Sequence, residues 1–153
     1  MSLLLRNGNG RWRVRLGLIF TLFGFLVFLI GAEPDLFSLD RSPVMGYVQI
    51  SVFLLGLGII CLGGYMALNV LLNGDPKSIA ADIGLRLVAT GYVIAIGSGL
   101  ADLLGFGSHP SPILAYFGPW QMRGVLIGQA VIAIGFVLLI PYRRHSQPVL
   151  PDV

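Results

Sequence analysis

"MGYVQISVFLLGLGIICLGGYMALNVLL", residues 45–72, carries no charged side chain along its whole length. A membrane-spanning helix needs roughly 20 consecutive apolar residues at 1.5 Å of rise per residue. The nearest charged residues, Arg41 and Asp75, flank the stretch on either side. The stretch therefore predicts a transmembrane helix, and this class of structure sets how the rest of the chain is interpreted.

One further apolar run precedes this stretch and two follow it, and short connections join the four runs. The four runs predict spans at about residues 16–32, 45–72, 85–107 and 122–141. Of the 153 residues 56% are hydrophobic and 11% are charged, whereas about 25% of residues are charged in soluble proteins. We expect one transmembrane domain, an all-α integral membrane antiparallel four-helix bundle, with a cytoplasmic N-terminal segment at 1–14 and a cytoplasmic tail at 142–153.

The basic residues predict the orientation of the bundle. Eight of the ten, including Lys77, Arg86, Arg143 and Arg144, lie on one side of the expected spans. Because positive loops stay in the cytoplasm, both termini are expected there, in a multi-pass protein of a bacterial plasma membrane. This distribution argues against a nucleic-acid partner. The first run is expected to be a retained helix and not a cleaved signal peptide, because Ile30 stands where cleavage requires a small residue.

Glycine recurs every seven residues within the expected spans. Two helical turns return nearly to the same face, so each helix carries a strip without side chains along which backbones can approach. In lipid, close packing of small residues drives helix association. The residues expected to pack helices in this way are Gly17, Gly24, Gly31, Gly56, Gly63, Gly84, Gly91, Gly128 and Gly135.

The two halves of the chain resemble each other. "DLFSLDRSP" (35–43) aligns without a gap with "DLLGFGSHP" (102–110), and Gly46, Gln49 and Gly56 recur 72 residues later as Gly118, Gln121 and Gly128. The pattern favours two tandem helical hairpins, which are parallel repeats because each unit crosses the membrane twice.

Asp102 follows a run of fifteen uncharged residues that begins after Arg86. A helix places it about 24 Å beyond that arginine, just inside the opposite membrane boundary. An acid within the membrane needs a partner, and we expect an ion pair with Arg123 that closes the last hairpin. Two alternatives are a helix-end residue that reaches water and a proton or cation site. Asp102 and His109 are too few ligands to predict a metal.

Polar side chains within the spans are few. Gln49, Asn69, Thr90 and Gln129 are most simply explained by interhelical hydrogen bonds. The connection "SHPSPILAYFGPW" (108–120) is rich in proline and in aromatic residues that prefer the headgroup level. We expect it to contact a partner through His109, Tyr116, Phe117 and Trp120.

No catalytic or phosphate-binding motif is present, so the sequence predicts neither an enzyme nor a cofactor. The expected function is that of a noncatalytic scaffold or accessory subunit, in contact with the lipid bilayer and with other subunits of a larger membrane protein complex. The alternatives are a small oligomeric transporter or channel that uses Asp102, and a membrane enzyme or lipid-binding protein that uses the outer loop.

Overall fold

A computed structural model describes residues 8–37, 46–71, 79–106 and 117–140. Within these ranges the chain is helical and contains no strand. The elements are α1 (Gly8–Ala32), the short 3-10 helix η1 (Pro34–Phe37), α2 (Tyr47–Leu71), α3 (Ile79–Gly99) and α4 (Pro119–Leu139). All four α-helices are long and apolar enough to cross a membrane. The all-helical class with four candidate spans is therefore confirmed.

The helix ends differ most from the expected spans in three places: the starts of α1 and α3, where α3 begins at Ile79 and not at residue 85, and the end of α3. α1 begins at Gly8, eight residues before the expected start, and its first turns include Arg11, Arg13 and Arg15. Arginine favours the helical state, so these residues extend the helix beyond the apolar run. α3 ends at Gly99, well before residue 107, and residues 100–105 form turns. Gly105, which continues the seven-residue spacing in the sequence, has φ 81° and lies outside the helix.

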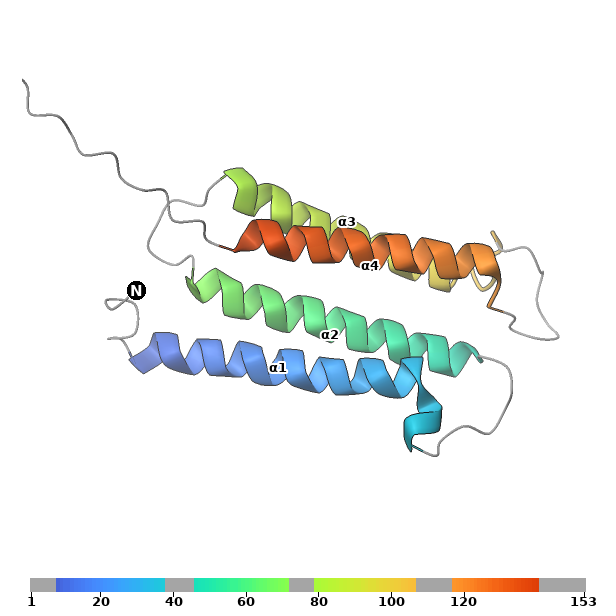
Figure 1. Ribbon diagram of the computed structural model, residues 1–153, viewed down its shortest axis with the longest axis horizontal. Coiled ribbons are helices and arrows are strands. Elements are labelled where there is room, and N and C mark those ends of the chain that lie inside the picture. Colours follow the sequence, from blue (N-terminus) through green and yellow to red (C-terminus); the bar gives the residue numbers. More distant parts are fainter. Residues whose placement is uncertain (1–7, 38–45, 72–78, 107–116, 141–153) are drawn as a thin grey trace, which may run out of the picture.

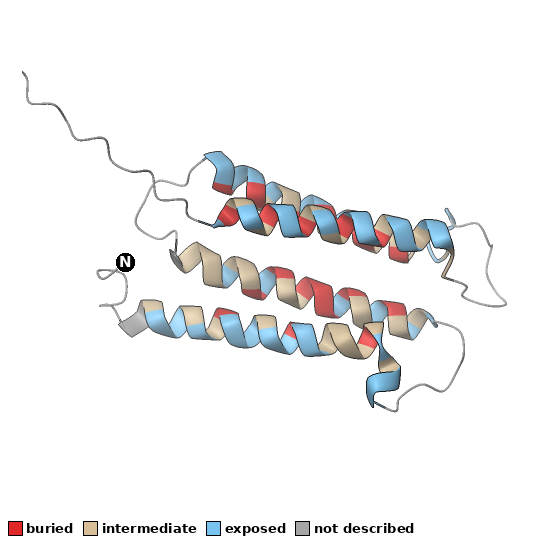
Figure 2. Cartoon of the chain, viewed as in Figure 1, coloured by how far each residue is buried: buried red, intermediate tan, exposed pale blue. Residues whose placement is uncertain are grey.

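The helices form two antiparallel hairpins, α1 with α2 and α3 with α4 (Figure 1). Contact between the hairpins is confined to α2 with α3 and α2 with α4, and within the described ranges α1 approaches neither α3 nor α4. α2 is consequently the most buried span: 39% of an 18-residue apolar stretch of α2 is buried, against 17% for α1. Figure 2 shows this difference as red and tan on α2 and mostly blue on α1.

Within each hairpin, glycine backbones lie against the neighbouring helix. A Cβ atom added to Gly24 would lie 2.7 Å from the Ile60 nitrogen, and one added to Gly91 would lie 2.6 Å from the Gly128 oxygen. Both distances are shorter than side chains tolerate. For all nine glycines expected at helix contacts, an added Cβ would approach the partner helix of the same hairpin to less than 3.0 Å. Close backbone packing of this kind holds helices together in lipid.

A second set of glycines lies at the contact between the hairpins. The Tyr92 ring of α3 lies on Gly58, and its hydroxyl donates a hydrogen bond of 3.3 Å to the Leu54 carbonyl oxygen. The Phe136 ring of α4 covers Gly64, where an added Cβ would meet it at 2.8 Å. These two glycines lie outside the seven-residue spacing, so the sequence reasoning missed them. Aromatic rings seated on glycine therefore join the two hairpins.

Candidate binding cavity between the hairpins

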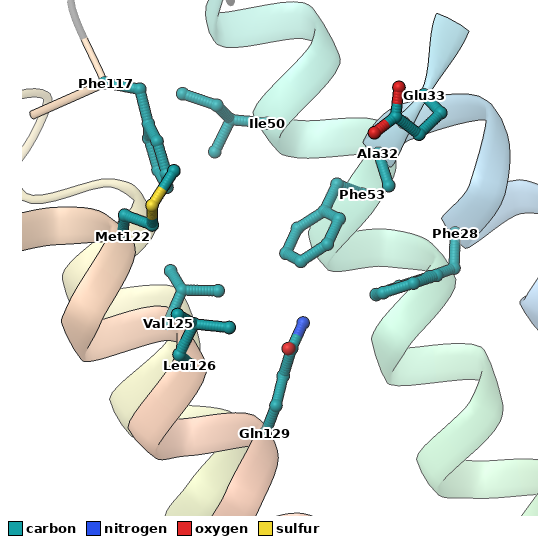
Figure 3. A pocket seen from close by; sticks show the side chains of 11 residues that line it. Phe28, Ala32, Glu33, Ile50, Phe53, Phe117, Met122, Val125, Leu126 and Gln129 are labelled. Atoms are coloured by element: carbon teal, nitrogen blue, oxygen red, sulfur yellow. The ribbon is translucent and has the colours of Figure 1, made fainter. Parts of the chain in front are cut away.

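A cavity of about 330 Å³ lies between α1, α2 and α4, at the end of the hairpins where η1 is found. Within the described ranges α1 contacts neither α3 nor α4, so no described element closes the space between α1 and α4. Figure 3 shows side chains from the three helices pointing into it. Its lining consists of Phe28, Gly31, Ala32, Glu33, Ile50, Phe53, Phe117, Met122, Val125, Leu126 and Gln129.

Most of the cavity wall is apolar and aromatic. The rings of Phe28 and Phe53 lie 4.7 Å apart between their centroids, and Phe117 lines the opposite side beside Met122 (Figure 3). Glu33, an exposed residue, stands where α1 ends. Such a wall with few polar groups is typical of small-molecule sites in proteins, which measure about 300–1,000 Å³.

Gln129 supplies the polar group at the far end of the cavity. Its amide points into the space between α4 and α2 (Figure 3), and the structure gives it no hydrogen bond to another described residue. Gln129 is the central residue of α4 (Pro119–Leu139), about 15 Å from each end. If α4 spans the bilayer, this amide lies at its centre. Among the described residues, the interhelical hydrogen bond expected for Gln129 is therefore not formed.

A second cavity of about 370 Å³ lies between α2 and α3 and includes Cys61, Tyr65 and Tyr92 in its wall. The thiol of Cys61 is free and buried. The Tyr92 hydroxyl already donates to the Leu54 carbonyl oxygen, so it is not free to donate to a ligand. The first cavity is the stronger candidate site.

The expected ion pair between Asp102 and Arg123 is not formed in the structure. The Arg123 guanidinium lies 5.0 Å from the centre of the Trp120 ring, three residues earlier on α4. This cation–π contact occupies the arginine and turns it along its own helix. Oδ1 of Asp102 is buried and has no hydrogen-bond partner among the described residues. An ion pair does form near the start of α3, where Arg86 Nη2 lies 2.9 Å from Asp82 Oδ2.

The four outer-loop residues expected to contact a partner have different positions. His109 and Tyr116 lie outside the described residues. Phe117 is half-buried and lines the first cavity, whereas Trp120 is 73% exposed. Within the described ranges no group of three or more His, Cys, Asp and Glu side chains could hold a metal ion.

Comparisons of the chain with protein-family models, curated proteins and solved structures find no match. The class of the protein therefore follows from its own helices. Four apolar helices of 21 to 24 residues define the chain as a multi-pass membrane protein.

Proposed function

We propose that this chain is a noncatalytic accessory subunit of a larger membrane protein complex, and that its partner packs on the outer face of α1. The observation that carries the proposal is the one-sided packing of α1. Within the described ranges this helix contacts α2 and η1 only, and 17% of its 18-residue apolar stretch is buried. A helix held along one side is free to take a second neighbour along the other.

The outer face of α1 is defined by residues that lie opposite its glycine contacts. Ile19, Leu22, Phe23 and Leu26 follow one another along this face at helical spacing, and each is at least half exposed. Lipid tails can cover such side chains equally well, since lipid is as apolar as leucine. A protein partner is favoured because, within the described ranges, α1 is the one α-helix of the four that contacts a single other α-helix.

Site-specific photocrosslinking in native membranes tests the proposal. A photoreactive residue replaces Leu22, which is 71% exposed, and the matched control replaces Val93 of α3, which is 67% exposed. We expect a discrete protein adduct from position 22 and none from position 93. The double variant Leu22→Ala/Leu26→Ala should lose the complex in mild detergent, whereas Val93→Ala should keep it. The proposal would be contradicted if both positions gave only lipid adducts and the chain ran in mild detergent as a monomer of 16.5 kDa.

A second candidate is a small oligomeric transporter or channel that uses Asp102 as a proton or cation site. The observation that favours it is the buried Oδ1 atom of Asp102, which lacks a hydrogen-bond partner. An unsatisfied buried carboxylate is costly, and a proton or cation would relieve it. Reconstituted liposomes loaded with a pH or cation dye test this. Flux that Asp102→Asn abolishes supports transport, and no flux from the wild-type chain excludes it under those conditions.

The two hairpins are proposed to be copies of one unit. Gly24 faces Ile60 in the first hairpin as Gly91 faces Ile132 in the second, and Gly63 faces Thr21 as Gly135 faces Val88. Gly24 and Gly91 are 67 residues apart, as are the stretches 35–43 and 102–110, and Gly63 and Gly135 are 72 residues apart, as are Gly56 and Gly128. Related contacts in equal register are the arrangement that duplication of a hairpin produces.

A further inference from the structure

We propose that the cavity between α1, α2 and α4 binds the ring of a membrane-dissolved quinone, with the Gln129 amide donating a hydrogen bond to a ring carbonyl. The proposal does not depend on the accessory-subunit function, because it uses only the cavity wall. The argument has three steps, which concern the polar group, the size and the access route.

The polar group excludes a plain acyl chain. The Gln129 amide points into the cavity at the middle of α4, and no described residue accepts its hydrogen bond. Gln129 is half-buried, and at the depth of the middle of α4 the bilayer offers no water to satisfy an unpaired amide. Phospholipid acyl chains carry no acceptor at that depth, and phospholipid headgroups lie near the boundary. The occupant must therefore bring a carbonyl or hydroxyl group to the bilayer centre.

The size of the cavity excludes a partner helix as its occupant. A helix about 10 Å across has a cross-section of roughly 80 Å², so a volume of 330 Å³ holds only about 4 Å of its length. A single flat ring with a short substituent fits. The rings of Phe28 and Phe53 on one side and Phe117 on the other supply aromatic faces, and aromatic pairs prefer offset or edge-to-face contact.

The access route suits a molecule that arrives from the bilayer. Within the described ranges α1 and α4 make no contact, so the cavity opens between them toward lipid. A quinone ring can enter from this side while its isoprenoid tail stays among the acyl chains. Glu33, directly after the end of α1, is one further polar residue in the cavity wall.

Photoaffinity labelling of the purified full-length chain in dodecyl maltoside tests the proposal. The probe is an azido-quinone with a short tail, decylubiquinone is the competitor, and the labelled residues are mapped by mass spectrometry. We expect labelling of the cavity wall that decylubiquinone competes at a saturable midpoint. Gln129→Leu should raise that midpoint about three- to tenfold, the range expected for loss of one neutral hydrogen bond. Leu126→Trp should abolish labelling because its ring fills the cavity from an exposed position.

Gln49→Leu is the matched control, because it makes the same chemical change on α2 at a position that does not line the cavity. It should leave the midpoint unchanged, and circular dichroism should show equal helix content in all variants. Equal midpoints for the wild type and Gln129→Leu would overturn the proposal. Labelling away from the cavity, or a retained phospholipid that decylubiquinone does not displace, would also overturn it. If Leu126→Trp fails to fold, the comparison of the midpoints of Gln129→Leu and Gln49→Leu still tests the quinone site.

Discussion

Replacing Gly91 by alanine tests the close packing of α3 on α4, and Gly97 of the same helix provides the control. An alanine Cβ at position 91 would lie 2.6 Å from the Gly128 carbonyl oxygen and 2.9 Å from the Ile132 nitrogen. At position 97 it would meet nothing within 4 Å. The two substitutions make the same chemical change, so their difference isolates the contact between the helices.

The magnitude follows from these distances. To reach an ordinary contact of 3.4 Å from 2.6 Å, the helices must move apart by about 0.8 Å at position 91. A gap of about 0.5–1 Å forfeits a quarter to a half of the dispersion attraction in the affected contacts, and overpacking of this kind costs about 1–3 kcal/mol. Alanine also favours the helix over glycine by about 0.5–1 kcal/mol at either position. Gly91→Ala should therefore be about 1–3 kcal/mol less stable than Gly97→Ala.

Reversible unfolding in mixed micelles provides the measurement. Sodium dodecyl sulfate is titrated into the purified protein, and the transition is followed by helix content together with the fluorescence of its two tryptophans, Trp12 on α1 and Trp120 on α4. The free energies of unfolding of the two variants and the wild type are then compared. A difference below about 0.5 kcal/mol between the variants, or a larger loss at Gly97, would refute the packing argument because both results lie outside the range expected for an overpacked contact.

Three further results are expected. Tyr92→Phe should lower stability by about 0.6 kcal/mol, the mean for hydrogen bonds between membrane helices, and a spin-label distance between α1 and α4 should broaden as the hairpins loosen. In a double-mutant cycle, the losses of unfolding free energy caused by Asp102→Asn and Arg123→Gln should add within about 0.5 kcal/mol, because the two side chains form no ion pair. A larger coupling energy would show that the two side chains do interact. Cysteines introduced at Ser2 and Ser111 should react with an impermeant reagent from opposite sides of the membrane, and labelling of both from one side contradicts the orientation.

Several features of the protein were determined by the sequence alone. Charged residues at the ends of long apolar runs predicted four spans, and the structure has four helices at those places. This inference works because a bilayer sets a required length and excludes charge, and both properties can be read along a single chain. The glycine spacing likewise identified one face on each helix, because the face depends only on the helical period and can be read along a single chain.

The partners of those faces were decided by the tertiary structure. Asp102 and Arg123 were expected to pair because they lie at similar depth, yet Trp120 holds the arginine on its own helix. Gln129 was expected to bond another helix, yet it lines a cavity that exists because α1 contacts neither α3 nor α4. Depth and face are properties of one helix, whereas contact depends on how two helices approach and rotate. In lipid no difference in hydrophobicity selects that arrangement, so the shapes of the packed surfaces, such as Tyr92 on Gly58, decide it.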